Sequence, residues 1–303
     1  MQITKKFFEA PLPFAQSVKG KKSEHLTFAR LMLENKWVDL LCFPGFSNFS
    51  LEETCQDFID LVTQMHPKEL SQMLKKPFEI THTNPHVEHG LFQLYAQDKQ
   101  SAAIVDKSNP KLTISHLVKN LSELGALMNI KLKISSDSEK FLTLAKQLSH
   151  YCTANPLLKF RLDANQSLST QELEQYFSII EELDLVTHLD YFEEPLKNHL
   201  DYLGLKANIP YALEESLDQY LKDKKHYKPQ ALVYKPSQQG LSKLSKLLKG
   251  EDREKVVISS CFDPLYAYEA TTLLAREFPS KAHGLGAKTR EEDISLSKKK
   301  ALL

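Results

Sequence analysis

Glycine and cysteine are both scarce in this chain of 303 residues. Nine glycines are fewer than the usual share of about 7% would give, so most turns must be built from Asn, Asp, Ser and Pro. The four cysteines show neither a Cys-x-x-Cys spacing nor a zinc-finger arrangement with histidine: Cys42, Cys55, Cys152 and Cys261. This excludes a disulfide framework of the secreted kind and predicts a protein of the reducing cytoplasm.

An excess of charge of either sign is also absent. Lysine plus arginine and aspartate plus glutamate number 39 each, which removes the broad basic surface expected of a protein that binds nucleic acid or anionic membranes. No apolar run of about 18 residues occurs, and Met1 to Lys6 has no apolar signal segment. We therefore expect a soluble cytoplasmic protein, monomer or homo-oligomer, with neither nucleic acid nor membrane as a partner.

From about Lys131 onward, short apolar runs alternate with amphipathic helical patterns, as in βα units around a parallel sheet. The predicted strands are Ile130–Ile134, Lys159–Asp163, Leu189–Glu193, Pro210–Glu214, Ala231–Lys235, Lys255–Ser259 and Ala282–Leu285. The helical patterns include Asp137–Tyr151, Ser169–Leu183 with a Ser169/Glu172 capping box, and Leu241–Leu248. Because eight strands close a barrel, a first strand is predicted at Ala102–Asp106, followed by a helix over Ile114–Leu127.

The first third of the chain lacks this rhythm. It mixes strand-like and helical runs: Leu26–Leu33, Val38–Cys42, Leu51–Met65 and His86–Tyr95. Such a mixture indicates a separate α+β domain. We predict two domains, the α+β domain over residues 1–98 and a β/α barrel over residues 99–285.

Ionisable residues occupy the C-terminal ends of five predicted strands: Lys133, Asp163, Glu193, Glu214 and Lys235. In a closed parallel barrel these strand ends meet at one mouth, where active sites of this architecture lie. Three carboxylates in one partly dry site repel each other, and a hard divalent cation with oxygen ligands relieves that repulsion. Mg²⁺ fits best, because it keeps positions open for the oxygens of a substrate carboxylate.

The two lysines then acquire a role. A metal-bound carboxylate acidifies the proton on its neighbouring carbon, and an amine whose pKa is lowered by nearby cations and by burial can remove it. Strand alternation puts Lys131 on the same face as Lys133, and it aligns Arg161 and Asn165 with Asp163.

The same alternation points Glu194 and Glu215 away from the barrel axis, where capping or a supporting ion pair is expected. A single acid at a strand end is more often a helix cap or a solvated loop residue. Five ionisable groups in register favour a functional cluster instead.

At these residues the chain resembles the o-succinylbenzoate synthase family of the enolase superfamily, which serves menaquinone biosynthesis. The resemblance extends over nearly the whole chain and is carried by Lys131-Leu132-Lys133, Arg161-Leu162-Asp163-Ala164-Asn165, Phe192-Glu193-Glu194-Pro195, Glu214-Glu215-Ser216, Tyr234-Lys235-Pro236-Ser237, Ile258-Ser259-Ser260, Pro44-Gly45-Phe46-Ser47 and Leu51-Glu52-Glu53-Thr54. It implies an α/β fold, a modified (β/α)8 TIM barrel of the (β/α)7β type with an N-terminal α+β capping domain. The tail, residues 286–303, is expected to pack back on that domain.

The resemblance also implies roles, carried over position by position. Asp163, Glu193 and Glu214 would hold Mg²⁺, for which Mn²⁺ can substitute. Lys133 would be the acid/base, and Lys235 would face it across a small carboxylate substrate. The family reaction is a syn dehydration: Lys133 removes the α-proton, the metal and Lys235 stabilise the enediolate, and protonated Lys133 assists departure of the hydroxyl.

Further residues are implied to surround the substrate. Lys131 and Arg161 would set the charge and orientation of Lys133 and Asp163. Substrate oxygens would meet Asn165, Ser259, Ser260 and the backbone near Gly284. The loop Pro44 to Ser47 is implied to cover the barrel mouth, with Phe46 and Ser47 shaping the pocket; the alternative is an ordinary Pro-Gly turn.

Two segments depart from the family pattern. The third metal position reads Glu-Glu-Ser at residues 214–216, where the family usually has Asp-Glu-Ser, so a carboxylate is kept on a longer side chain. Lys36-Trp37-Val38-Asp39 replaces the usual Gly-Trp-Gly-Glu and leaves the strand register before the capping loop open.

Other functions stay open. An N-acylamino acid racemase or a dipeptide epimerase would use the same metal and lysines to exchange a proton in either direction. Dipeptide epimerases usually carry Asp-x-Asp at the last strand, whereas this chain reads His283-Gly284-Leu285-Gly286, which argues against a dipeptide. A barrel that has lost catalysis and serves as a binding scaffold would predict broken lysines or acids, yet all five positions hold competent residues.

Overall fold

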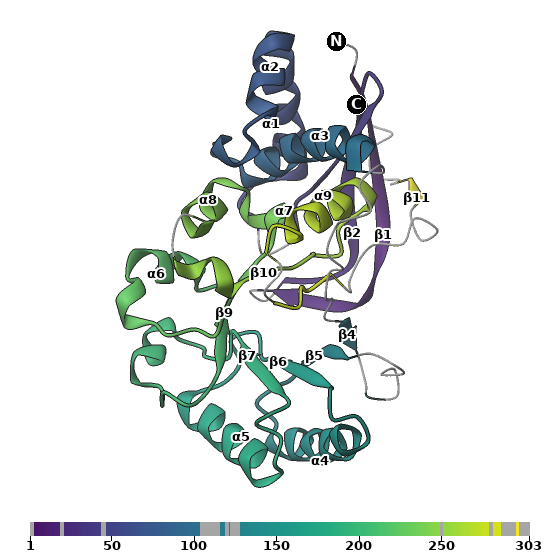
Figure 1. Cartoon of the computed structure of the whole chain (residues 1–303). Helices are drawn as coiled ribbons and strands as arrows, with labels where there is room; N and C mark the ends of the chain where they lie inside the picture. Colours follow the sequence, from purple (N-terminus) through teal and green to yellow (C-terminus); the bar gives the residue numbers. More distant parts are fainter. Residues whose placement is uncertain are drawn as a thin grey trace.

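The structure is a computed structural model and describes residues 3–18, 21–43, 47–103, 116–118, 121, 128–248, 251–278, 281–285 and 295–296. Figure 1 shows two parts, an antiparallel sheet with helices packed beside it and a curled parallel sheet covered by helices. The predicted fold class, a modified β/α barrel with an N-terminal α+β domain, is confirmed.

The N-terminal sheet has the strand order β11-β1-β2-β3 and is antiparallel. Its strands are β1 (Ile3–Val18), β2 (Lys21–Leu33), β3 (Lys36–Leu41) and β11 (Ser295–Leu296). The two strands predicted here are confirmed. Because β11 pairs with β1, a segment near the end of the chain lies on the N-terminal sheet.

The helices of this part are α1 (Leu51–Gln64), α2 (Pro67–Leu74), α3 (Pro85–Ala103) and the short 3-10 helix η1 (Pro77–Glu79). They pack on the sheet through an apolar cluster that includes Leu31, Leu40 and Phe58. Both helices predicted in this region are confirmed. The α3 helix continues past residue 98, where the domain boundary is predicted.

The parallel sheet has seven neighbouring strands in chain order: β4 (His116–Val118), β5 (Asn129–Lys133), β6 (Lys159–Asp163), β7 (Leu189–Glu193), β8 (Tyr211–Leu213), β9 (Ala231–Tyr234) and β10 (Val256–Ile258). The six strands predicted from residue 130 to residue 259 are confirmed within a few residues. At Ala282–Leu285, isolated bridge residues take the place of the predicted strand, and Gly284 forms a parallel bridge with Ser259.

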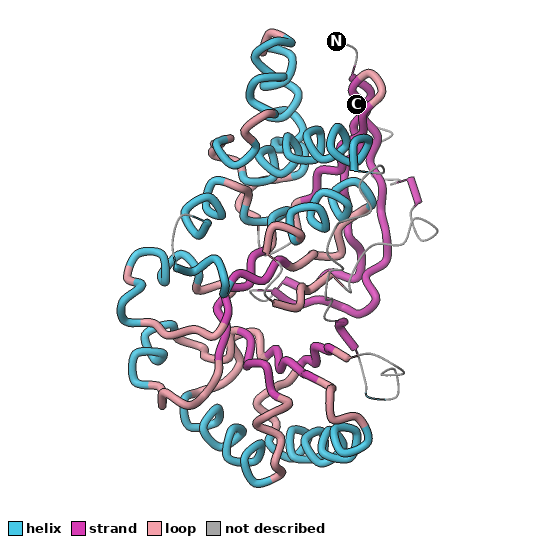
Figure 2. Tube along the Cα trace, viewed as in Figure 1, coloured by secondary structure: helices cyan, strands magenta, loops and turns pink. Residues whose placement is uncertain are grey.

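Helices follow most of these strands: α4 (Ser138–Ala154), α5 (Thr170–Glu182), η3 (His199–Gly204), α6 (Leu217–Lys222), η4 (Lys224–His226), α7 (Pro236–Gln239), α8 (Ser242–Leu248), η5 (Glu251–Lys255) and α9 (Leu265–Ala275). Figure 2 shows helices α4 and α5 on the outer side of the curled sheet, away from the N-terminal strands. The predicted capping box of Ser169 and Glu172 is present at α5. Alternation along the strands sends a small second cluster to the inner side: Tyr191, Ala212, Ala231, Val233 and Val257.

The prediction for the start of the barrel was wrong. Ala102 belongs to the last turn of α3, since consecutive alanines favour continuation of a helix, and residues 104–106 lie outside the described residues. Inside the predicted helix Ile114–Leu127 the chain forms β4 instead, paired in parallel with Ile130 to Leu132 of β5. Backbone pairing with a neighbouring strand outweighs a weak local helical pattern.

The two parts meet where β3 and α3 pack against α9. Asp39 of β3 accepts a hydrogen bond from the backbone nitrogen of Tyr266 at 3.1 Å, and the rings of Trp37 and Tyr266 stack with centroids 6.2 Å apart. These contacts join the N-terminal sheet to a barrel helix. Among the described helices, none combines the length and apolar character needed to cross a membrane.

Candidate active site

Strand pairing brings the predicted site residues to one edge of the parallel sheet. Lys133 is in register with Asp163, and Asp163 is in register with Glu193 on the next strand. Glu214 and Lys235 come directly after the last residues of β8 and β9. All five residues therefore lie at the carboxyl edge, as predicted from their spacing.

Lys131 ties two of the carboxylates together. Its Nζ atom donates to Glu193 Oε1 at 2.8 Å and lies 3.1 Å from Asp163 Oδ2. Burial opposes the charge of this lysine, but the carboxylates of Asp163 and Glu193 outweigh burial and raise its pKa. Lys131 is therefore a fixed cation between two acids.

Lys133, two residues further along β5, stays in contact with solvent at the mouth. Partial burial lowers the pKa of Lys133. The ammonium groups of Lys131 and Lys235 lower it further, while the carboxylate of Asp163 opposes them. Of the three lysines of the site, Lys133 is the one whose pKa is lowered toward neutral pH. That direction suits a base.

Lys235 forms an ion pair with Glu214, its neighbour on the adjacent strand. Burial alone would favour the neutral amine, yet the carboxylate of Glu214 raises the pKa of Lys235. Burial and the nearby Glu215 raise the pKa of Glu214 itself, although Lys235 acts against them. Lys235 is thus held as an ammonium in this arrangement.

The carboxylates differ from one another. Burial, opposed by Lys131 and reinforced by Asp163 and Glu214, raises the pKa of Glu193 to about 7. Asp163 is equally enclosed, but the three lysines Lys131, Lys133 and Lys235 overcome burial and lower its pKa. The three carboxylates share the positive charge of the same lysines. A further cation beside them would stabilise their ionised forms.

Glu194 anchors the loop that carries Glu214. Its Oε2 atom accepts from the backbone nitrogens of Glu214 at 2.6 Å and Ser216 at 3.2 Å, and its Oε1 accepts from the Ser216 hydroxyl. The supporting role predicted for Glu194 is confirmed. For Glu215 the prediction was wrong: it lines one cavity with Glu214 and Lys235, because β8 ends at Leu213 and strand alternation stops there.

Arg161 lies inside the barrel, two residues before Asp163. Its Nε donates to Asp190 at 2.8 Å, one terminal nitrogen donates to the carbonyl of Ala282 at 2.7 Å, and the guanidinium covers the Tyr191 ring at 4.6 Å. The Arg161 side chain is buried, whereas its hydrogen bonds to Asp190 and Ala282 are partly buried. They fix β6 and thereby Asp163, in line with the orienting role expected of Arg161.

Asn165 holds the other side of the Asp163 carboxylate. Its Nδ2 donates to Asp163 Oδ1 at 2.6 Å, and its backbone nitrogen lies 3.2 Å from the same oxygen. This tight turn uses a positive φ of 46° at Asn165, a conformation that asparagine tolerates better than most residues. Asp163 therefore has one oxygen on Asn165 and the other on Lys131.

Ser259, Ser260 and Gly284 gather beyond the end of β10. Both hydroxyls lie within 3.3 Å of the Gly284 carbonyl, and the Ser260 nitrogen donates to it at 3.0 Å. A Cβ atom at position 284 would come within 2.5 Å of the Ser259 hydroxyl, so only glycine allows this close approach. Their predicted contact with substrate stays a prediction.

The capping segment reaches the barrel through Ser47, while Pro44, Gly45 and Phe46 lie outside the described residues. The Ser47 hydroxyl lies 2.8 Å from His86 Nε2, and His86 Nδ1 lies 2.7 Å from the carbonyl of Ser237. A carbonyl only accepts, so Nδ1 carries the hydrogen. Burial lowers the pKa of His86 to about 4, which keeps the ring neutral.

A cavity of about 570 Å³ opens beside these groups. It brings Glu214, Glu215 and Lys235 of the barrel next to Ser47, His82 and His86 of the N-terminal part. A substrate that reaches Lys235 through this cavity would meet residues of both parts.

The three predicted metal ligands have the chemistry that Mg²⁺ prefers, because all are carboxylates on adjacent strands. Within the described ranges, no three His, Cys, Asp or Glu side chains already form a metal-holding group. Ammonium groups take up the carboxylates instead, Lys131 two of them and Lys235 the third. The donors thus fit Mg²⁺ by type and by strand position.

Solved enzyme structures superpose on nearly the whole chain. The o-succinylbenzoate synthase of Thermosynechococcus elongatus BP-1, complexed with Mg in its active site, matches with a TM-score of 0.69 and 20% identity over 94% of this chain and 93% of that one. The dipeptide epimerase of Methylococcus capsulatus, complexed with Mg and L-Arg-D-Lys, matches with a TM-score of 0.71 and 16% identity over 97% and 91%. The chain has the enolase-superfamily fold. No protein-family model and no curated protein sequence matches it.

A second dipeptide epimerase with this enolase-superfamily fold, that of Enterococcus faecalis V583 with Mg and L-Leu-L-Tyr, gives a TM-score of 0.69 at 14% identity over 97% of this chain and 99% of that one. At 20% identity or less, such matches show the fold. Synthases and epimerases share it, so the reaction has to be argued from the site residues.

Sequence reasoning missed His86, His82 and Gln238, which join the cavity from α3, the loop before it and α7. Gln238 follows Ser237 in the segment that carries the resemblance. Its position one helical turn after Lys235 could have indicated that it lies near the site. His86 gave none, since its partners are 39 and 151 residues away.

Proposed function

We propose that this protein is a magnesium-dependent lyase that dehydrates 2-succinyl-6-hydroxy-2,4-cyclohexadiene-1-carboxylate to 2-succinylbenzoate, the reaction of the o-succinylbenzoate synthase family. One observation carries the proposal: Lys133 and Lys235 meet three carboxylates at the carboxyl edge of the parallel sheet. The coarser statement, an acid–base enzyme of the enolase superfamily, has the same support.

Asp163, Glu193 and Glu214 would hold the Mg²⁺ ion. Bound there, the ion supplies positive charge that neutralises a substrate carboxylate and acidifies the adjacent carbon. The protein prepares this position with Asn165, which orients Asp163, and with Glu194, which holds the Glu214 loop.

Lys133 would act as the base and then as the acid. Its amine takes the proton from the carbon beside the carboxylate, and the electron pair left behind forms the new ring double bond as the hydroxyl departs. The same amine, now protonated, gives its proton to that hydroxyl, so that water leaves. Lys235, held as an ammonium beside Glu214, faces the negative charge that develops on the substrate.

Racemisation is the second candidate, because the matched structures include epimerases. Proton exchange from both faces needs each lysine to serve as a base in turn, whereas Lys235 is ion-paired with Glu214. A dipeptide substrate also needs an acid for its ammonium group. At the last strand His283 is instead buried, accepting from the Ile258 nitrogen at 3.1 Å and lying 2.6 Å from the Phe278 carbonyl.

The deciding experiment supplies each substrate class to the purified protein. We expect the cyclohexadiene carboxylate to lose its diene absorbance in the presence of Mg²⁺, with little loss after EDTA treatment, and recovery when Mg²⁺ or Mn²⁺ is restored. Parallel reactions in D₂O with N-succinylamino acids and with dipeptides test for proton exchange. Exchange without dehydration would replace the synthase proposal by racemisation, and no turnover of any substrate would favour a non-catalytic scaffold.

We also propose a cytoplasmic location. None of the four cysteines, all of which the structure describes, is in a disulfide, and three of them are buried. Thiols that stay reduced accord with a reducing compartment. Recovery of the protein in the periplasmic or secreted fraction of its own cells would contradict this location.

A further inference from the structure

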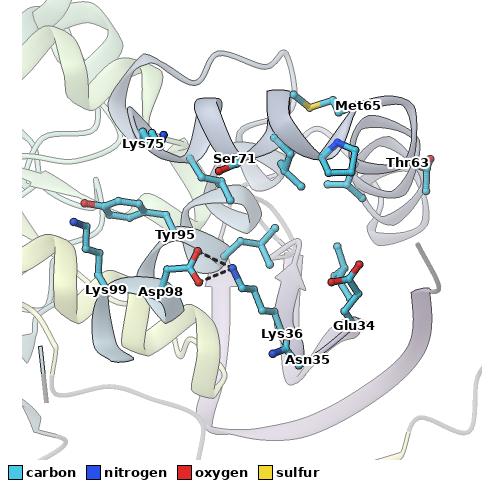
Figure 3. A pocket seen from close by; sticks show the side chains of 16 residues that line it. Glu34, Asn35, Lys36, Thr63, Met65, Ser71, Lys75, Tyr95, Asp98 and Lys99 are labelled. Carbon is cyan, nitrogen blue, oxygen red and sulfur yellow. Dashed lines mark hydrogen bonds and ion pairs between the residues drawn. The ribbon is translucent and has the colours of Figure 1, made fainter. Parts of the chain in front are cut away.

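A second cavity lies in the N-terminal part, separate from the barrel mouth. It has a volume of about 670 Å³ and shares no lining residue with the cavity that contains Lys235. Figure 3 shows its walls, which come from the β2–β3 turn, the end of α1, helix α2 and the C-terminal half of α3. This volume is in the range of pockets that hold small organic molecules.

The depth of this cavity is apolar. Leu33, Val62, Leu74 and Leu94 line it and belong to the core beneath the helices. Leu70 of α2 adds a half-buried side chain closer to the opening. A ligand therefore needs an apolar body that can replace water against these side chains.

The rim of the cavity carries charged side chains, and the sign of the charge differs between its two ends. Lys36 is ion-paired with Asp98 at 2.7 Å, so these two charges cancel. Figure 3 shows Lys75, Tyr95 and Lys99 toward one end and Glu34 toward the other. The Lys99 ammonium lies 5.7 Å from the centre of the Tyr95 ring, and neither Lys75 nor Lys99 is ion-paired within the described part of the chain.

We propose that this cavity binds a compact organic anion, a molecule with an aromatic or aliphatic body and one anionic group. The body would lie against Leu70 and the leucines of the floor, and the anionic group would lie between Lys75 and Lys99. The ring of Tyr95 would flank the body beside that group. The site is a binding site additional to the barrel mouth and does not depend on which reaction the barrel performs.

The probe for this site is 8-anilinonaphthalene-1-sulfonate, which combines an aromatic body with one sulfonate and emits strongly when removed from water. We expect saturable binding to the folded full chain with one site per molecule. The double substitution K75E/K99E should weaken binding at least tenfold, because it reverses both charges at the anion end. K68E, on the exposed face of α2 and outside the cavity, is the matched control and should stay within twofold of the unchanged protein.

Two further measurements keep the outcome decisive. Ser71→Trp places a large side chain in the opening without altering charge, and it should also abolish binding while thermal unfolding shows an intact fold. Glu215→Gln, in the cavity at the barrel mouth, should bind the probe as the unchanged protein does. The proposal fails if the unchanged protein shows no saturable binding, if K75E/K99E and Ser71→Trp bind as it does, or if Glu215→Gln weakens binding as much as K75E/K99E.

Discussion

Lys131 serves the site as a cation built into the chain. Its ammonium lies between Asp163, at 3.1 Å, and Glu193, at the 2.8 Å typical of a charge-assisted hydrogen bond. Two buried carboxylates on adjacent strands would otherwise repel each other with little solvent to screen them. The lysine thus lets this edge of the sheet fold before any metal arrives, and Mg²⁺ has to compete with it.

Removal of this ammonium should make folding depend on the metal. In Lys131→Met the two carboxylates lose their shared partner, and the loss of one member of a buried ion pair costs about 3 kcal/mol. We expect a lower thermal midpoint in EDTA and a larger rise on addition of Mg²⁺ than in the unchanged protein, measured by circular dichroism. An equal response to Mg²⁺ in the two proteins would contradict the role of Lys131 as an internal substitute for the ion.

Lys133 should be indispensable for turnover and dispensable for metal binding. Lys133→Ala removes the proposed acid/base, and general acid–base groups contribute about 10²–10⁴-fold to rates. We expect kcat to fall by at least 10³-fold because one amine serves two steps, while Mg²⁺ affinity by calorimetry changes little. Lys140→Ala, an exposed lysine of α4, is the control. Near-normal turnover by Lys133→Ala would rule out this base.

At the scale of single residues, sequence reasoning worked where a strand dictates direction. Lys133, Asp163 and Glu193 could be assigned to one edge because alternation and repeat spacing fix them. It failed for Glu215, which follows the end of β8, and it did not foresee the ion pair of Lys235 with Glu214. Side-chain pairing depends on rotamers and local charge, which the order of residues does not contain.

Among the elements, α3 connects the two parts most directly. Its first turn enters the barrel, where Glu88 accepts from the backbone nitrogens of Leu241 at 2.7 Å and Ser242 at 3.0 Å. The carboxylate thereby caps the start of α8, and it also accepts from His82 at 2.7 Å. Gly240 packs against this carboxylate with a φ of 76°, so a side chain there would be strained and crowded.

The Glu88 contact should matter for stability more than any surface ion pair. Glu88→Ala leaves three backbone N–H groups without their acceptor, and an unsatisfied buried donor costs about 1–3 kcal/mol. We expect a loss of about 3 kcal/mol or more in chemical denaturation, with Glu88→Gln intermediate because its amide oxygen still accepts. Surface controls such as Lys76→Ala, which breaks an exposed pair with Glu79, should change stability by less than about 1 kcal/mol. Equal stabilities for Glu88→Ala and Lys76→Ala would refute this account.

Most elements could be predicted from the sequence because their local signals agree with their surroundings. Helix α5 has its capping box and apolar stripe, and β5 to β10 are short apolar runs at regular spacing. One element that was predicted wrongly, β4, is a three-residue strand whose pairing with β5 decides its structure. Strands this short carry too little pattern of their own to be recognised before their partner is known.

In the whole molecule, buried ionisable groups link stability to pH in two directions. His89 of α3 lies 3.3 Å from the hydroxyl of Thr271 of α9, and burial together with His86 lowers its pKa to about 3. Asp263, on the same threonine, has its pKa raised by burial to about 6. On acidification the histidine opposes folding because the unfolded chain binds its proton first, whereas the aspartic acid favours folding.

Replacement of His89 should isolate its share of this balance. Below pH 6.5 the unfolded state of the unchanged protein binds a proton on His89, whereas the folded state binds it only near pH 3. His89 therefore lowers the free energy of unfolding by up to about 1.4 kcal/mol for each pH unit in this interval. In His89→Gln this term is absent and Asp263 is kept. We expect the variant to gain stability relative to the unchanged protein as pH falls from 6.5 to 4, measured by urea denaturation. A pH-independent difference would show that His89 does not titrate on unfolding.

The whole-molecule arrangement was the part least accessible to sequence reasoning. His86 joins Ser47 to Ser237, which is 151 residues away from it in the sequence. Glu88 joins α3 to the start of α8 through Leu241, which is 153 residues away. No periodicity or motif encodes such pairs. Such contacts form only when the surfaces of the two parts meet. The fold of each part could therefore be predicted from the sequence, but the contacts between the parts could not.

The stack of Trp37 on Tyr266 makes the junction observable by light. Trp37 is the only tryptophan of the chain, and its ring lies nearly parallel to that of Tyr266, at an angle of 8°. One indole on β3 touches one phenol on α9, so its emission colour and intensity report whether sheet and barrel remain in contact. A shift of that emission before the circular dichroism changes would reveal the two halves parting while each is still folded.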